Sequence, residues 1–232
     1  MEKLVGIILM AGLSTRFGGP KNKQLCLLNG RPVFSYSIDT FASYKNFEEI
    51  IIVVNEDNKS IVEQYLKDRS IKANVVLGGK TRQESVENAL KTLKNDDYAV
   101  VVIHDAARPL IDVFIINQVV KAAIEEGAST AYVEVTDTVS VKNEKDEIVG
   151  SVSRNTLASI QTPQAFRLDV LKKAHKNASN KEATDDCSLV LALPHKVKLV
   201  KGDKKYHKVT TPEDIKYLEG LLKQWKHTKL EK

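Results

Sequence analysis

The sequence predicts an α/β fold in which helices flank a mostly parallel, twisted sheet. Short apolar runs without polar alternation recur along the chain, which is typical of strands buried on both faces. Segments with apolar residues at helical spacing separate these runs, and repeated strand–helix order favours parallel strands. The length of 232 residues fits a single domain over residues 1–232 with a small appendage.

The first part of the chain follows this alternation. The run over 4–9 predicts the first strand, and a short extended piece at 24–28 ends in a turn at Asn29-Gly30. The pattern continues with expected strands over 49–54, 73–77, 98–103 and 129–135, and with expected helices over 32–44, 57–70, 82–93 and 113–126. Ligands of such sheets bind outside the carboxyl ends of the strands, so the loops that follow the apolar runs are the expected place of a site.

The pattern changes after residue 135. Residues 136–160 alternate apolar and polar residues around a polar turn at 143–147, which predicts a β-hairpin that projects from the sheet. A lone two-stranded hairpin is marginal in water, so we expect this arm to pack on something, such as a second copy of the protein. The rest of the chain predicts helices over 168–177, 186–193 and 212–225 and a strand over 197–200.

The composition is that of an ordinary soluble protein of a reducing cytoplasm. Hydrophobic residues make up 42% and charged residues 28% of the chain. No apolar run reaches the roughly 18 residues of a membrane span, and the N-terminus lacks the layout of a signal peptide. Cys26 and Cys187 form no C-x-x-C pair. Much of the net charge of +5 lies near the C-terminus, where a solvated helix end is favoured over nucleic-acid binding.

A loop of small and cationic residues follows the first expected strand. Gly12 lets backbone amides approach an anion, and Arg16, Lys21 and Lys23 bring positive charge. The glycine spacing fits neither a Walker A motif nor a dinucleotide fingerprint. Fixed cations stabilise the charge that develops when a triphosphate is attacked at its α-phosphorus. The loop therefore predicts a triphosphate site, with a glycine loop and solvent-facing cations as the alternative.

Two further loops follow strands of the expected sheet. Gly78-Gly79 permits close backbone approach to a flat ring, and the hydroxyl of Ser85 could meet a base edge. Asp105 ends another strand, and Mg²⁺ prefers one or two carboxylates together with phosphate oxygens. A cap on the following loop is the competing interpretation of Asp105. We expect the neighbouring His104 to be structural rather than a general base.

Polar residues later in the chain are candidates for binding a second, phosphorylated substrate. Taken singly, each is better interpreted as structural, and the segment 184–186 also fits a helix N-cap. Together they supply the cations and hydroxyls that such a substrate requires: Thr138, Arg154, Gln161-Thr-Pro-Gln164, Thr184-Asp185-Asp186 and Lys208.

In order and spacing, these motifs resemble one family over nearly the whole chain, the 2-C-methyl-D-erythritol 4-phosphate cytidylyltransferases of the non-mevalonate isoprenoid pathway. The residues that carry the resemblance are Ala11-Gly12-x-x-x-Arg16, Lys23-Gln24, Gly78-Gly79-x-x-Arg82-x-x-Ser85-Val86, His104-Asp-Ala-Ala-Arg-Pro109, Asp137-Thr138, Arg154, Gln161-Thr-Pro-Gln-x-Phe166, Thr184-Asp185 and Lys208-Val-Thr-x-Pro-Glu-Asp214. The resemblance implies a Rossmann-like nucleotidyltransferase fold and a homodimer joined through the arm at about 136–160. It also implies transfer of CMP from CTP to methylerythritol phosphate, with Mg²⁺ and with release of pyrophosphate.

The resemblance further implies roles for individual residues. Arg16 and Lys23 would stabilise charge at the α-phosphate and the leaving group, Arg154 and Lys208 would also be catalytic, and Asp105 would bind the metal. The residues implied to bind the nucleotide are Met10, Ala11, Gly12, Ser14, Gly79, Lys80, Arg82, Ser85 and Ala106. Those implied to bind the polyol phosphate are Arg108, Thr138, Arg154, Thr162, Thr184, Asp185 and Lys208, with Thr138 and Arg154 supplied by the partner's arm.

Some positions depart from the family pattern. The family usually has Pro-Lys-Gln, whereas this chain has Pro20-Lys-Asn-Lys-Gln24, so Lys21 stays a rival to Lys23 as the catalytic lysine. Lys80 stands where Asp is common, on the side of the cytosine amino group. Tyr206-His207 replaces the usual Asn-Ile on the side of the second substrate.

The sequence leaves two alternative functions open. A D-ribitol-5-phosphate cytidylyltransferase shares the fold and the CTP loop, but it tends to carry Val where this chain has Ala107. A non-catalytic nucleotide-binding regulatory module is less favoured, because the chain keeps the charged residues Arg16, Lys23, Asp105 and Lys208.

Overall fold

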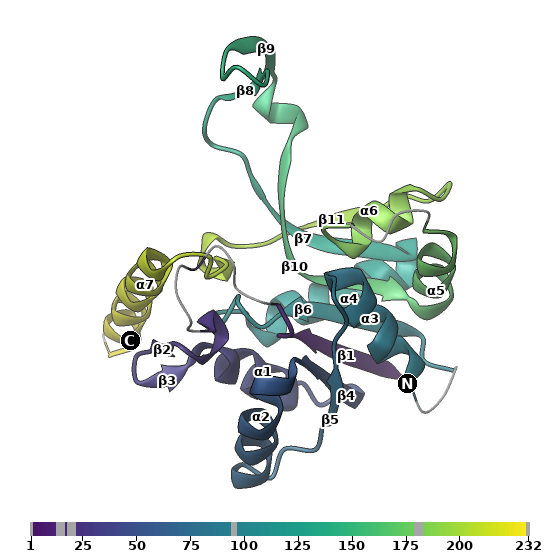
Figure 1. The fold of residues 1–232 in the computed structure, drawn as a ribbon, viewed down its shortest axis with the longest axis vertical. Coiled ribbons are helices and arrows are strands. Elements are labelled where there is room, and N and C mark those ends of the chain that lie inside the picture. Colours follow the sequence, from purple (N-terminus) through teal and green to yellow (C-terminus); the bar gives the residue numbers. More distant parts are fainter. Residues whose placement is uncertain (1, 13–16, 18–21, 94–96, 179–182, 231–232) are drawn as a thin grey trace.

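The computed structural model describes residues 2–12, 17, 22–93, 97–178 and 183–230. Its centre is a seven-stranded sheet (Figure 1). In spatial order the strands are β11 (Lys198–Lys201), β7 (Ala128–Glu134), β10 (Ala158–Arg167), β6 (Val100–Asp105), β1 (Leu4–Leu9), β4 (Phe47–Val54) and β5 (Asn74–Leu77). Every neighbouring pair is parallel except those made by β10, which runs antiparallel to β6 and β7. The predicted α/β fold with a mostly parallel sheet is confirmed.

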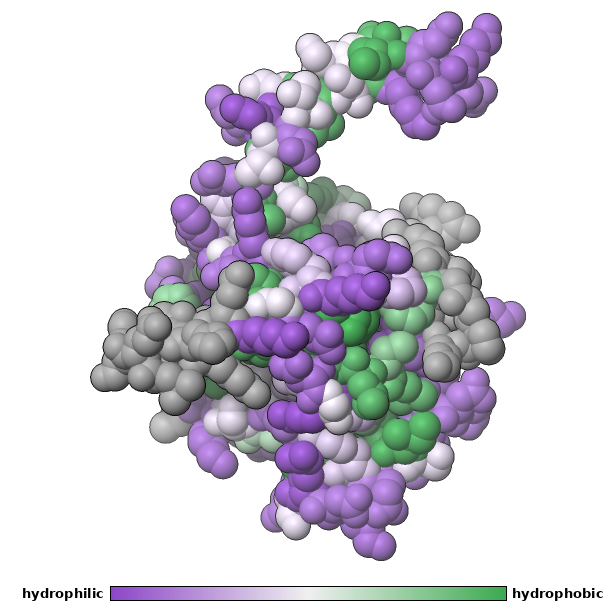
Figure 2. Space-filling view, turned by 90° about the vertical axis from the view of Figure 1, so that its left-hand side faces the viewer, coloured by the Kyte–Doolittle hydropathy of each residue, from purple (hydrophilic) through white to green (hydrophobic). Residues whose placement is uncertain are grey.

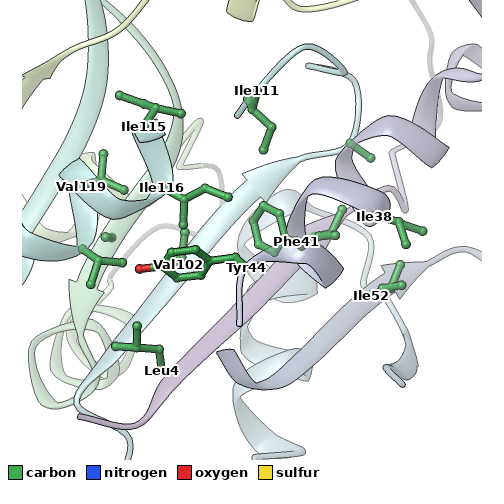
Figure 3. Close-up of a cluster of buried hydrophobic side chains, with 14 of the residues drawn as sticks. Leu4, Ile38, Phe41, Tyr44, Ile52, Val102, Ile111, Ile115, Ile116 and Val119 are labelled. Carbon is green, nitrogen blue, oxygen red and sulfur yellow. The ribbon is translucent and has the colours of Figure 1, made fainter. Parts of the chain in front are cut away.

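Helices cover both faces of the sheet because its central strands are apolar on both sides. Along β1, Leu4 and Ile8 belong to one buried cluster, whereas Val5 and Ile7 belong to another, as the two-residue period of a strand requires. The first cluster packs under α1 (Val33–Ser43), α2 (Glu56–Asp68) and α4 (Val113–Glu126), and Figure 3 shows part of it. The second packs under α3 (Arg82–Lys91), α5 (Leu168–Asn177) and α6 (Asp186–Leu191).

The last helix, α7 (Pro212–Leu230), packs away from the two main clusters. Leu218 of α7 joins a small third cluster with Leu28 and Val33. Leu28 belongs to β2 (Leu27–Leu28), which pairs with β3 (Arg31–Pro32) in a separate two-stranded sheet. In the described part of the chain, each helix is either too short or too polar to span a bilayer.

Two segments differ from the sequence-based expectation. Strand β10 was not predicted, because Pro163 and three buried polar residues interrupt its apolar pattern. Its pairing with β7 is irregular between Ile160 and Gln164, where the proline lies. The expected extended piece at 24–28 begins instead as a short 3-10 helix, Lys23–Leu25, which Asn22 caps by accepting from the Gln24 amide.

The predicted arm is present as a hairpin of β8 (Val139–Lys142) and β9 (Ile148–Val152). These two strands pair only with each other within the described part of the chain, and the hairpin stands away from the body of the molecule (Figures 1 and 2). Its apolar side chains are exposed: Ile148 is 75% and Val149 is 61% accessible. These apolar side chains of the arm are therefore left uncovered by the described residues of their own chain.

Candidate active site

A cavity of about 530 Å³ lies at the carboxyl edge of the sheet. It forms where β1, β5 and β6 end, since parallel strands bring the loops that follow them to one edge. The predicted site residues on its walls come from five separate segments: Ala11, Gly12, Lys23, Gly79, Lys80, Arg82, Ser85, Asp105 and Lys208. A second hollow of about 700 Å³, lined in part by Tyr98 and Arg167 near the opposite ends of the strands, holds none of the predicted residues.

One wall of the cavity consists of closely packed backbone. A Cβ atom on Gly78 would lie 2.4 Å from the Cβ of Ala11, so only glycine allows the two loops to approach this closely. The hydroxyl of Ser85 accepts from the Gly79 amide at 3.1 Å and donates to the carbonyl of Thr81 at 2.9 Å. These contacts fix the second glycine loop against the first turn of α3.

Asp105 is the electrostatic centre of the site. Its Oδ2 accepts from Nζ of Lys208 at 2.5 Å, and its Oδ1 accepts from Nε of Arg82 at 3.4 Å. Burial alone would raise the pKa of Asp105, but the charges of Lys208, Arg82 and Arg108 outweigh it and hold the pKa well below its usual range. The carboxylate therefore stays ionised at neutral pH.

A buried series of hydrogen bonds fixes the backbone of Asp105. The Asp105 amide donates to Oγ1 of Thr162 at 3.1 Å, and this hydroxyl lies 3.0 Å from Nδ1 of His104. Nε2 of His104 lies 3.1 Å from the carbonyl of Arg108, which can only accept, so the proton is on Nε2 and Thr162 donates to Nδ1. Burial lowers the pKa of His104 to about 3, so this histidine is neutral and structural, as the sequence predicts.

Several other predicted residues lie near the cavity without facing it. Met10 is buried, and its carbonyl accepts from the Asn58 side chain at 3.4 Å. The amide of Met10 donates to the carbonyl of Val53 at 2.8 Å, and the amide of the buried Ala106 donates to the carbonyl of Leu9 at 3.0 Å. Arg108 donates to the carbonyl of Tyr206 at 2.8 Å and lines a separate hollow of about 370 Å³.

The remaining predicted residues lie elsewhere. Asp185 caps α6 by accepting from the Ser188 amide at 3.0 Å, and the preceding Thr184 is exposed. The segment 184–186 also fits a helix N-cap by its sequence, and Asp185 has that role in the structure. On the arm, where Thr138 also lies, Arg154 donates to the carbonyl of Thr136 at 2.9 Å. Ser14, Arg16 and Lys21 fall outside the described residues.

Sequence reasoning missed two residues at the site and one contact. Asn55 and Thr81 line the cavity and cap α2 and α3, accepting from the amides of Asn58 and Glu84. Both lie in a loop that follows a strand and within two residues of the start of an expected helix, which is the signal that could have identified them. Asp186 pairs with Arg82 at 2.5 Å, but 104 residues separate the two and no local pattern indicates the contact.

The arrangement is that of a nucleotidyltransferase. An ionised carboxylate and cations at the carboxyl edge of a parallel sheet can hold a triphosphate, and glycine loops leave room for a base beside it. Comparison with known proteins specifies this class further. The chain belongs to the 2-C-methyl-D-erythritol 4-phosphate cytidylyltransferase family, whose model matches residues 4–224.

Individual relatives agree with this assignment over the full length. A 2-C-methyl-D-erythritol 4-phosphate cytidylyltransferase of Clostridium perfringens (strain SM101 / Type A) is 37% identical over 227 residues, covering 96% of this chain and 100% of the relative. That of Dictyoglomus thermophilum is 38% identical over 229 residues, with coverages of 96% and 97%. The crystal structure of 4-diphosphocytidyl-2C-methyl-D-erythritol synthase from Anaerococcus prevotii superposes with a TM-score of 0.83 at 27% identity, covering 96% of this chain and 99% of that one.

Proposed function

We infer that the chain transfers CMP from CTP to 2-C-methyl-D-erythritol 4-phosphate and releases pyrophosphate. Family membership over residues 4–224 supports the reaction and both substrates. The structural observation that carries the proposal is the meeting of Lys23, Asp105 and Lys208 in one cavity of about 530 Å³ beside the glycine loops. The cavity wall therefore carries fixed charges of both signs, which binding of a triphosphate next to a second phosphate requires.

In this proposal the glycine wall holds the nucleotide. The backbone around Ala11, Gly12 and Gly79 offers close approach to a flat base, and Ser85 fixes that backbone. The buried Met10 and Ala106 would support this wall, and Lys80 and Arg82 line the same cavity. One buried nitrogen of Arg82, Nη2, has no hydrogen-bond partner among the described residues, which supports a donor role toward an anionic ligand.

The transfer needs positive charge rather than a general base. A phosphate oxygen of the methylerythritol phosphate forms a bond to the α-phosphorus of CTP, the bond from this phosphorus to the oxygen that bridges it to the β-phosphorus breaks, and pyrophosphate leaves with that oxygen. The attacking phosphate is already ionised near neutral pH, and the buried, neutral His104 is not required as a base. We assign Lys23 and Arg16 to the charge on the α-phosphate and leaving group, and Lys208 to the incoming phosphate.

The donor set fits Mg²⁺ bound mainly through the substrate. No group of three His, Cys, Asp or Glu side chains suitable for a metal occurs among the described residues, so a cage made of protein side chains alone is not expected there. Asp105 is an ionised carboxylate on the cavity wall, and Mg²⁺ commonly takes one or two carboxylates with phosphate oxygens and water. When bound at Asp105, the ion would add positive charge to the triphosphate.

We further propose that the second substrate is bound by residues of two chains. Lys208 would act from the same chain at the cavity wall. Arg108, Thr162, Thr184 and Asp185 would act from the same chain only through the roles that the resemblance implies, since none of the four lines this cavity. Thr138 and Arg154 would come from the arm of a partner subunit. The exposed apolar surface of the arm and its position away from the body support a homodimer joined there (Figure 2).

Three further parts of the proposal concern the chain as a whole. One sheet with a core on each face supports a single nucleotidyltransferase domain over residues 1–232. Cys26 and Cys187 form no disulfide, which fits a reducing cytoplasm. The substrates require neither nucleic acid nor a membrane.

Pyrophosphate release with a panel of acceptors tests the proposed function. Purified protein is supplied with CTP, Mg²⁺ and either methylerythritol phosphate, ribitol 5-phosphate or no acceptor, and ATP replaces CTP as the nucleotide control. We expect the fastest release with CTP and methylerythritol phosphate. Equal turnover of ribitol 5-phosphate would contradict the acceptor, and CTP binding without release from any acceptor would favour a regulatory module.

A further inference from the structure

A fully buried carboxylate lies behind the cavity wall. Asp186, the first residue of α6, is inaccessible to solvent, and both of its oxygens are paired. Oδ2 accepts from Nη1 of Arg82 at 2.5 Å, and Oδ1 lies 2.9 Å from Nε2 of His175. A buried charge without partners is very costly, so the orientation of Asp186 and that of these two side chains depend on one another.

Arg82 connects this carboxylate to the cavity. Its Nη1 contacts Asp186 at 2.5 Å, whereas its Nε contacts Asp105 at 3.4 Å. Burial alone lowers the pKa of Arg82, but the charges of Asp186 and Asp105 outweigh it and raise the pKa above its ordinary value. The guanidinium therefore contacts both carboxylates, but it lies closer to Asp186, which does not line the cavity, than to Asp105, which does.

His175 of α5 completes the chain of contacts. Its side chain is almost fully buried, and its Nδ1 lies 3.6 Å from a carboxylate oxygen of Glu87 on α3. A line of side chains therefore runs from Glu87 and His175 through Asp186 and Arg82 to Asp105. It joins α3, α5 and α6 to the end of β6, where the cavity begins.

We propose that Asp186 is a positioning residue for the transfer reaction, anchoring Arg82 so that the guanidinium stays beside Asp105 without closing over that carboxylate. This role rests on the function proposed above for Arg82 and Asp105 in binding CTP and metal. Without the charge of Asp186, Asp105 would be the remaining carboxylate bonded to Arg82 among the described residues. The guanidinium would turn toward Asp105 and compete with Lys208 and the metal for its oxygens.

A double-mutant cycle tests this role. Asp186→Asn keeps the shape of the side chain and removes its charge, and Arg82→Gln removes the guanidinium. We expect Asp186→Asn to lower kcat/KM for CTP by about 10- to 100-fold, the usual effect of losing a group that orients a ligand of the site. In the Arg82→Gln background the same change is expected to add little, because residues that act through one another are not additive. Equal factors in both backgrounds would overturn the proposal.

CTP binding measured by calorimetry without acceptor is the second readout. Asp186→Asn is expected to weaken CTP binding, and Asp169→Asn, which removes an exposed carboxylate of α5, is expected to leave it unchanged. A wild-type chain that neither binds CTP nor releases pyrophosphate would refute the proposed function. A fully active wild type beside a fully active Asp186→Asn chain would overturn only the positioning role.

Variants at His175 separate positioning from folding. If thermal unfolding shows no cooperative transition for Asp186→Asn, the cycle is run with His175→Leu, which removes the hydrogen bond to Asp186 and leaves its charge. His175→Gln keeps an N–H donor and is expected to recover most of the activity that His175→Leu loses. Wild-type activity of His175→Leu, or equal losses in both Arg82 backgrounds, would contradict the proposal.

Discussion

Nζ of Lys208 lies 2.5 Å from Oδ2 of Asp105, so the loop before α7 is tied to the end of β6. The next residue, Val209, donates its amide to the carbonyl of Ala107 at 2.8 Å, which adds a backbone contact between the same two segments. Residues more than 100 positions apart thus hold one charge pair at the cavity wall. The pair combines the proposed metal ligand with the proposed cation for the acceptor phosphate.

Lys208→Met is expected to lower turnover by about 10²-fold or more, by analogy with the loss of one fixed charge contact to a transition state. The change keeps most of the length of the side chain and removes the ammonium group. Lys201→Met, at an exposed position on β11, is the matched control and is expected to leave pyrophosphate release unchanged. A near-normal rate for Lys208→Met would remove this lysine from the reaction.

Lys23→Ala is likewise expected to reduce turnover by about 10²-fold or more, because Lys23 lines the cavity and would face the leaving group. Lys21→Ala is the comparison that decides between the two lysines of the Lys-Asn-Lys segment. Rates of pyrophosphate release at saturating CTP give the answer. A nearly normal Lys23→Ala enzyme beside a slow Lys21→Ala enzyme would transfer the role to Lys21.

Mixed dimers test whether the arm serves the partner's site. Arg154→Ala and Lys23→Ala chains, each nearly inactive alone, are mixed and allowed to exchange subunits. If Arg154 acts in the partner's cavity, one of the two sites in a mixed dimer has both residues intact, and activity partly returns. Mass spectrometry of differently tagged chains confirms that mixed dimers form, and their continued inactivity would contradict a shared site.

Acid stability is expected to depend on His104. Its pKa is about 3 in the folded chain, against an ordinary value of 6.5, so the unfolded state binds the additional proton between these values. Stability is therefore lost as the pH falls below about 6.5, and His104 contributes up to about 1.4 kcal/mol per pH unit to the slope. Asp105, whose pKa is also lowered, adds a loss of the same sign at more acidic pH.

Urea unfolding at several pH values measures this slope. His104→Gln loses part of the hydrogen bonding and is expected to be less stable than the wild type at pH 7. Its free energy of unfolding should fall less steeply between pH 6 and about 4, by roughly one bound proton. Parallel curves for the two proteins would show that His104 does not carry the effect.

The parallel part of the sheet could be predicted because the signal for each strand lies within the sequence of that strand. Strands β1, β4 and β6 are buried on both faces, so their apolar residues stand in unbroken runs. Glycines and Asp105 directly after such runs could be assigned to one edge of the sheet. The site was thus predictable wherever a strand end supplied the residue.

Strand β10 and the buried network could not be predicted for the opposite reason. The polar side chains of Gln161, Thr162 and Gln164 are buried, and each has a partner distant in the sequence, so their pattern resembles a loop. The contact of Arg82 with Asp186 depends on how α3 and α6 meet on the sheet. Only the folded arrangement brings such partners together.

Strand β10 leads from the arm back into the sheet, and it also supports the backbone of Asp105. Its first residues lead out of the hairpin, and Thr162, a few positions later, accepts from the Asp105 amide. One residue added before Thr162 would turn the following side chains to the opposite face of the sheet, whereas changes in the turn at 143–147 leave that register intact. The turn of the arm can therefore vary in length. The number of residues between the hairpin and Thr162 must stay constant, because it sets on which face of the sheet Thr162 lies.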